Sequence, residues 1–106
     1  MIKKLGKRIL KDVPENNAFW LKTDHYNVIT QIRNLNDFAK EITKAPTAAI
    51  VHHLREGRND FADWIEFVVG DKVLSEKLRK IKAKNWKSMQ KEIVFLVTQR
   101  IKQIKA

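Results

Sequence analysis

HHLREGRNDFADWIEFVVGDKVL, residues 52–74, is the stretch that decides the fold predicted for this chain of 106 residues. Gly57 and Gly70 can each adopt the left-handed conformation that ends a helix, and Asn59 and Asp71 follow them as helix N-caps. Between these two corners four apolar residues recur at helical spacing: Phe61, Trp64, Ile65 and Val68. We therefore predict a central helix over residues 59–69, around which the core is built.

Further helices are predicted on both sides of the central one. Asn34 or Asn36 caps a helix that Pro46 ends, and Pro46 also suits the first turn of a helix over residues 47–56. The helix that Asp71 caps is expected to bury Val73, Leu74, Leu78 and Ile81. The connections are only two or three residues long, so successive helices must turn sharply against one another.

A β-hairpin is predicted before the helices. Residues 18–23 and 28–33 are rich in strand formers, and the four residues between them are of turn-forming types. A lone hairpin is barely stable, so one face must lie on the helices. We expect that face to hold Phe19, Leu21, Val28, Thr30 and Ile32, with Trp20 and Ile29 on the other face or at its rim.

The last predicted helix covers residues 86–104 and has the broadest apolar surface. Its run Ile93 to Val97 is too wide for one stripe, so several neighbours must cover it. We expect a protein partner, a second copy of the chain or the N-terminal helix to do so, through Ile93, Leu96, Val97 and Ile101. A buried strand is the alternative, because periodicity cannot separate helix from strand over five residues.

The predicted fold class is mostly α (α+β): a compact orthogonal helical bundle with a small N-terminal β-hairpin and a long basic C-terminal helix. We divide the chain into a basic arm and linker (1–17), a helical domain with the hairpin (18–82) and a basic amphipathic helix (83–106). The sequence has no cysteine, which fits a reducing cytoplasm. No signal peptide or membrane span is expected.

The net charge of +10 is unevenly distributed along the chain. Residues 1–11 carry five bases and no acid, and residues 77–106 carry ten bases and one acid, whereas residues 12–76 carry seven bases and eleven acids. The basic ends could be solvated faces that favour solubility. They could instead bind a polyanion, since each neutralised phosphate releases counterions and adds affinity.

Trp86 is the most informative residue of the basic C-terminal part. It lies between Lys84 and Lys87, so it could stack on an unpaired base while the lysines hold phosphates. Alternatively, its spacing to Met89 and Ile93 makes it the first core residue of the last helix. The predicted nucleic-acid contacts are Lys77, Arg79, Lys80, Lys82, Lys84, Trp86, Lys87 and Lys91, with Lys3, Lys4, Lys7 and Arg8 as a second arm.

Two histidines and three acids are candidates for a metal site or for catalysis. His52 and His53 lie near Glu56 at helical spacing, but two ligands are too few for a metal site, so no metal or cofactor is predicted. We expect His53 to hydrogen-bond across the Gly57 corner to Asn59 or Asp60. Asp63 and Glu66, like Asp60, suit a helix start better than acid and base catalysis, because no nucleophile or phosphate-binding loop accompanies them.

From Phe19 to about Ile81 the chain resembles a family of small, mainly archaeal domains that have no settled activity. The resemblance rests on the opening strand, on the helix start Asn-Leu-Asn-Asp-Phe-Ala, and on a pattern similar to the family's His...Asn-Asp-Phe-x-x-Trp...Gly-Asp signature. Its residues here are His53, Asn59, Asp60, Phe61, Ala62, Trp64, Ile65, Gly70, Asp71 and Leu74. The resemblance implies a helical fold and an archaeal-type cytoplasmic setting, and it brings no catalytic residues.

The sequence favours a non-enzymatic protein that binds RNA or DNA, in a ribonucleoprotein or in chromatin, with little sequence preference. Lys outnumbers Arg in the basic ends, which favours contacts to the phosphate backbone over reading of bases. Arg55 and Arg58 could add phosphate contacts or pair with Glu56 and Asp60. The alternative is a protein interaction module that docks through its C-terminal helix. A third hypothesis places the amphipathic ends on an anionic membrane surface.

Overall fold

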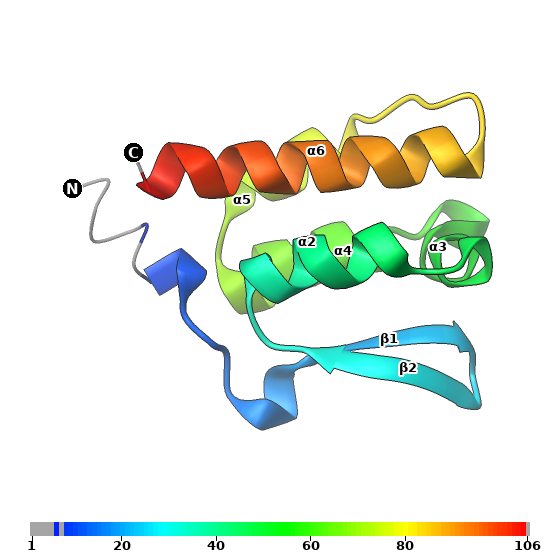
Figure 1. Ribbon diagram of the computed structural model, residues 1–106, viewed down its shortest axis with the longest axis horizontal. Helices are drawn as coiled ribbons and strands as arrows, with labels where there is room; N and C mark the ends of the chain where they lie inside the picture. The colour runs from blue at the N-terminus through cyan, green and yellow to red at the C-terminus, as the bar shows by residue number, and fades with distance from the viewer. Residues whose placement is uncertain (1–5, 7, 106) are drawn as a thin grey trace.

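The computed structural model describes residue 6 and residues 8–105 of the chain (Figure 1). Residues 8–10 are helical. The elements that follow are η1 (Glu15–Asn17), β1 (Phe19–Asp24), β2 (Asn27–Ile32), α2 (Leu35–Lys44), α3 (Thr47–Leu54), η2 (Arg55–Gly57), α4 (Asp60–Trp64), the π-helical turn η3 (Ile65–Val69), α5 (Lys72–Arg79) and α6 (Trp86–Lys105). The predicted fold class, mostly helical with a small hairpin, is confirmed. The predicted arm residues Lys3, Lys4 and Lys7 lie outside the described residues.

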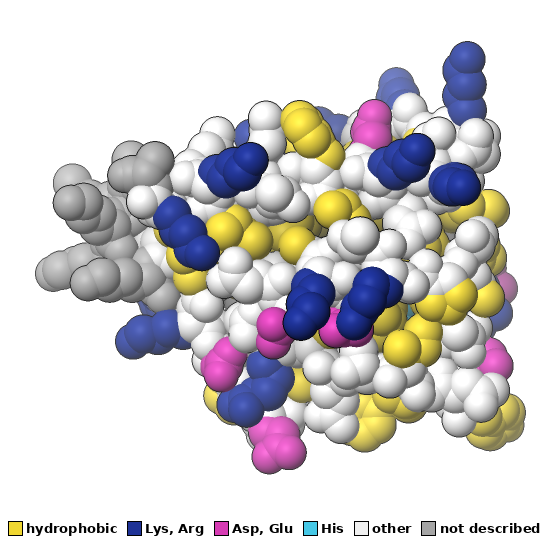
Figure 2. All heavy atoms as spheres, viewed as in Figure 1, with side chains coloured by type: hydrophobic (Ala, Val, Ile, Leu, Met, Phe, Trp, Pro, Cys, Tyr) yellow, Lys and Arg dark blue, Asp and Glu magenta, His cyan; other side chains and the backbone are white. Residues whose placement is uncertain are grey.

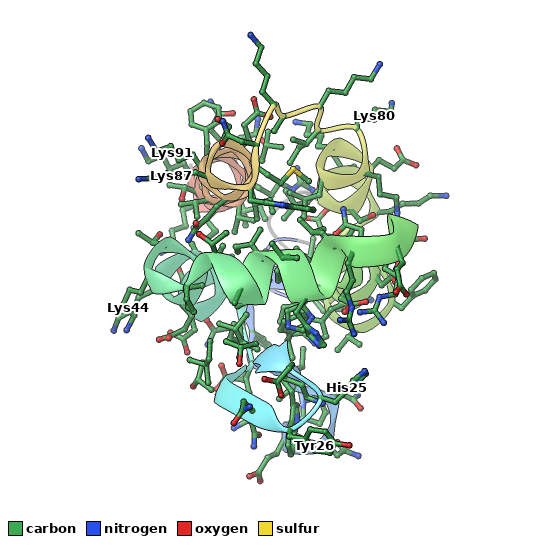
Figure 3. All side chains as sticks on the ribbon, turned by 90° about the vertical axis from the view of Figure 1, so that its right-hand side faces the viewer. His25, Tyr26, Lys44, Lys80, Lys87 and Lys91 are labelled. Atoms are coloured by element: carbon green, nitrogen blue, oxygen red, sulfur yellow. The ribbon has the colours of Figure 1, made fainter. Side chains whose placement is uncertain are left out.

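The elements are arranged in layers. Figure 1 shows the hairpin at one side, α2 and α4 in the middle, and α6 at the other side. Figure 3 is turned by 90° and shows α3 along its length where α6 is seen end-on, so α3 runs across α6. Within the described residues, none of the helices is both long and apolar enough to cross a membrane.

Most of the predicted helix ends agree with the structure, because contacts between residues near in sequence fix them. Asn34, Asn59 and Asp71 each occupy an N-cap, and each side chain accepts a hydrogen bond from the backbone amide three residues later. Gly70 ends η3 with a φ of 88°, in the left-handed region, as predicted. The prediction that Gly57 ends a helix over residues 47–56 is wrong: α3 ends at Leu54, Arg55 after it is extended, and both Glu56 and Gly57 have positive φ in the turn η2. The central helix thus spans the residues expected of it, as α4 and η3 together.

The hairpin departs from the prediction on its inner face. Phe19, Leu21 and Ile32 are buried, but Val28 is 44% exposed, so its predicted inward position is wrong. The reason is the strand register, which shifts between Leu21 and Lys22 and places Val28 opposite Lys22. A shift of one residue in an antiparallel pair turns a side chain to the other face.

α6 is covered mainly by the chain's own core. Ile93, Val97 and Ile101 are buried and Leu96 is half-buried against the same cluster, so the prediction that these four form a docking surface is wrong. The run is helical and not a strand. Near the end of α6, the buried Gly6 lies against Ile104, which agrees with the expectation that the N-terminal helix covers part of α6.

One of the four apolar residues predicted to be buried after Asp71 is exposed. Val73 is 51% exposed, so its predicted burial is wrong, whereas Leu74 and Leu78 are buried as expected. Ile81 follows the end of α5 and is half-buried against the core. The buried face of α5 consists of Leu74, Ser75 and Leu78, and Val73, about 100° from Leu74 in the direction away from Ser75, lies on the exposed side.

Candidate nucleic-acid interface

An open groove of about 680 Å³ lies where the loop of residues 80–85 leads into α6. Its apolar lining is buried or half-buried and consists of Leu54, Leu78, Ile81, Ala83 and Met89. Its polar lining consists of Arg58, Asn59, Arg79, Lys82, Lys84 and Asn85, together with Trp86. Among the described residues that line this groove, none is Asp or Glu. The groove therefore has an apolar interior beneath a strongly cationic rim.

The loop that carries the lysines is fixed at both ends. The amide of Lys80 donates to the carbonyl of Lys77 as α5 ends. At the start of α6, the side chain of Asn85 accepts a hydrogen bond of 2.8 Å from the amide of Ser88, as an N-cap does. Lys82 and Lys84 lie between these points and are exposed. A short loop between two packed helices thus carries both lysines at the lining of the groove.

The two arginines in the groove have different partners. Arg79 donates to Asp63 at 2.8 Å and to Glu66 at 3.0 Å, and these two carboxylates raise the pKa of its guanidinium. Arg58 donates to the carbonyl of His52 at 2.9 Å, and its nearest carboxylate oxygen, in Asp60, is 4.0 Å away. The donors of Arg79 are therefore engaged by two carboxylates, which disfavours the predicted phosphate contact, while Arg58 keeps donors available.

Trp86 is 42% exposed and lies among the cations of the groove. The alternative in which it is the first core residue of α6 is wrong. α6 packs against the core only after its first turn, where Met89 is half-buried and Ile93 is fully buried. The first turn of α6 extends past the edge of the core, which leaves part of the indole open to solvent.

The remaining predicted cations lie away from the groove lining. Figure 3 shows Lys87 and Lys91 pointing to one side of α6, above Lys44 of α2, and Lys80 on the opposite side. Lys87 and Lys91 line a second, smaller hollow of about 290 Å³. Lys77 and Arg8 are exposed outside either hollow. The face shown in Figure 2 has Lys and Arg side chains along α6, with most of its Asp and Glu side chains below them.

His53 has a structural position that the sequence predicted only in part. Its Nδ1 lies 2.9 Å from Asp60, as expected, and its Nε2 accepts a hydrogen bond of 3.0 Å from the backbone amide of Lys22 in β1. Because Nε2 must be unprotonated to accept, Nδ1 carries the proton and donates to Asp60. Burial lowers the pKa of His53 despite the opposing effect of Asp60. The neutral ring thus joins the hairpin to the start of α4.

His52 and His25 complete a small histidine cluster beside the hairpin turn. The rings of His52 and His25 are 5.6 Å apart, and Arg55 lies 3.3 Å from His25 Nε2. The pKa of His52 is lowered by burial first and then by Arg55. No three His, Cys, Asp or Glu side chains among residues 8–105 are placed to hold a metal ion. Burial and Arg55 thus both favour the neutral form of His52.

Comparisons with models of known protein families, with curated proteins and with solved structures found no match. The resemblance to an archaeal family over residues 19–81 therefore stays a prediction. What this chain does must be argued from its own residues.

Proposed function

We propose that this protein binds nucleic acid, without catalysing a reaction, through the groove between α5 and the start of α6. The observation that carries the proposal is the presence of Arg58, Lys82 and Lys84 on one concave surface whose described lining includes no carboxylate. A concave surface with charges of one sign concentrates the electrostatic field, which favours an extended polyanion.

The chemistry of the cations indicates the kind of contact. An ammonium group is a compact point charge that suits a phosphate oxygen, whereas the planar guanidinium and side-chain amide groups are better shaped for bidentate reading of a base edge. Lys82 and Lys84 lie on a loop, with side chains that are exposed and able to follow a backbone. We therefore propose binding with low sequence specificity, in which contacts to phosphates supply most of the affinity.

The carboxylates near the groove support a non-enzymatic role. Asp60 accepts from His53, and Asp63 and Glu66 both accept from Arg79. A general acid or base needs a group that can gain and lose a proton next to its substrate. These three carboxylates are instead engaged in contacts between structural elements.

The test is a salt titration of binding with a matched pair of variants. Each phosphate contact to a single strand contributes about −0.7 to the slope of log affinity against log salt concentration. Lys82→Gln/Lys84→Gln should therefore make the slope shallower by about 1.4. Lys102→Gln/Lys105→Gln removes the same charge at the other end of α6, from exposed positions outside the groove lining, and should change it less. Equal slopes in the two variants would contradict the proposal.

A second candidate, a protein interaction module, is favoured by one observation on α6. Phe95 is 59% exposed and lines a shallow hollow with Lys91, Glu92 and Leu96. If a second copy of the chain covers this residue, sedimentation of the protein should show a dimer that Phe95→Asp dissociates. A monomer over the whole concentration range would leave this candidate without support.

A further inference from the structure

We propose that the groove takes a single-stranded segment of nucleic acid, with one unpaired base stacked on the indole of Trp86. The inference rests on the proposed nucleic-acid binding and goes beyond it by naming the form of the ligand and the residue that selects that form. It follows from three features of the groove: the exposure of Trp86, the size of the groove and the chemical character of its lining.

Trp86 differs from the two other tryptophans of the chain. Trp64 is 6% exposed, and its ring nitrogen donates to the carbonyl of Asn17 at 2.8 Å. Trp20 is 48% exposed but lies on the hairpin, where Lys22 lies 5.9 Å from its ring centre. Trp86 alone lies in the groove that holds Lys82 and Lys84. An exposed aromatic ring among phosphate-binding cations is the arrangement by which proteins bind single strands.

The size of the groove also favours an unpaired nucleotide. Pockets that enclose small molecules have volumes of about 300–1,000 Å³, and the groove, at about 680 Å³, is large enough for one nucleotide and part of its neighbours. The faces of the bases inside a duplex are covered by the adjacent base pairs. A duplex can therefore offer phosphates to the lysines but no base face to Trp86.

The groove lining offers hydrogen-bond donors almost exclusively from its side chains. Asn59 and Asn85 each use the side-chain oxygen as a helix cap, for Ala62 and Ser88 respectively. Their amide NH₂ groups can still donate to a ligand, as can the ammonium groups of the lysines. A ligand that fits such a lining is rich in acceptors, as phosphate oxygens and base carbonyls are. An acidic peptide shares the negative charge but has no comparable flat ring to place on Trp86.

The experiment compares four ligands on the full chain at one salt concentration: an oligothymidine, a blunt-ended duplex of two separate strands with the same total number of phosphates, thymidine monophosphate and polyglutamate. The unaltered protein should bind the single strand at least tenfold more tightly than the duplex. Trp86→Ala should weaken single-strand binding roughly 5- to 150-fold, the loss expected for one stacking contact, and leave duplex binding nearly unchanged. Trp86→Phe should retain most of the affinity, because it keeps an aromatic ring.

A fluorescence measurement locates the contact. In the Trp20→Phe variant, Trp86 and the buried Trp64 are the remaining indoles, so quenching on addition of the single strand reports on Trp86. Trp20→Ala serves as the matched control, since it removes an indole of similar exposure outside the groove and should leave binding unchanged. Unchanged circular dichroism shows that the Trp86 variants remain folded.

The possible failures are distinguishable. Absence of binding to both oligonucleotides would overturn the proposed function itself. Equal affinity for single strand and duplex, with no effect of Trp86→Ala but a loss in Lys82→Gln/Lys84→Gln, would overturn the single-strand inference and leave nucleic-acid binding standing. Tighter binding of polyglutamate or of the free monophosphate than of the strand would overturn it in favour of an acidic peptide or a free nucleotide.

Discussion

Arg100 of α6 pairs with Asp71 at the start of α5, and this contact allows a sharp prediction about stability. Arg100 donates from Nε to one carboxylate oxygen at 2.8 Å and from its terminal nitrogen to the other at 3.2 Å. The Asp71 side chain is 1% exposed and that of Arg100 is 18% exposed. Asp71 also caps α5 by accepting from the amide of Leu74. The pair therefore joins the two helices that border the groove.

Removal of Arg100 leaves a buried carboxylate with one remaining hydrogen bond from Leu74. Breaking a buried ion pair by deleting one partner costs about 3–5 kcal/mol, because the other charge stays desolvated and unpaired. We expect Arg100→Met to lower the free energy of unfolding by that amount. Methionine keeps most of the length and apolar stem of arginine, so the loss reflects charge and hydrogen bonding more than packing.

Arg79→Met is the matched control, since it makes the same substitution at an exposed pair. The side chains of Arg79 and Asp63 are 36% and 53% exposed, and exposed ion pairs contribute about 0.2–1 kcal/mol each. Urea unfolding followed by circular dichroism gives both free energies. In addition, Asp71→Asn combined with Arg100→Met should be more stable than Arg100→Met alone, because no buried charge remains. A loss in Arg100→Met no larger than that in Arg79→Met would refute this reasoning.

Two further predictions concern the corners of the central helix. Burial lowers the pKa of His53, so the unfolded chain takes up a proton at higher pH than the folded one, and stability should fall as the pH drops below the ordinary histidine value of 6.5. His53→Gln should show a shallower fall between pH 7.5 and 5 in thermal melts, and an unchanged slope would contradict this. Gly70→Ala should lower the free energy of unfolding by about 1–2 kcal/mol in urea titrations, because φ is 88° and alanine disfavours that conformation. An added Cβ meets no atom within 4 Å, so no steric clash contributes to the loss. Gly70→Asn should cost less, and a cost equal to that of alanine would contradict the backbone explanation.

The helix boundaries could be predicted from the sequence because their causes are local. A cap such as Asn59 or Asp71 satisfies an amide only three residues away, and a glycine such as Gly70 is favoured where φ is positive. The same holds for the link between His53 and Asp60, which lie seven residues apart across one corner. In each case the interacting groups are only a few residues apart in the sequence, so the local backbone conformation brings them together.

The errors arise where a contact depends on a distant element. Val28 is exposed because of a register shift in the hairpin, and no residue type signals that shift in advance. Trp86 has the periodicity of a core residue, but its burial depends on where the core ends along α6. The backbone amide of Lys22 as a partner of His53 was likewise out of reach, because backbone donors leave no trace in the sequence.

The groove itself shows why a count of charges could not locate a site. The basic residues of the C-terminal part lie within thirty positions of one another, yet Arg79 is held by acids, and Lys87 and Lys91 line a different hollow from Lys82 and Lys84. The groove gains its third available cation, Arg58, from a segment whose net charge is negative. That cation is brought to the lysines because the corner at Gly57 faces the loop before α6. In the proposed function, the affinity for a polyanion should therefore depend on Arg58 at this corner as much as on the lysines of the basic end.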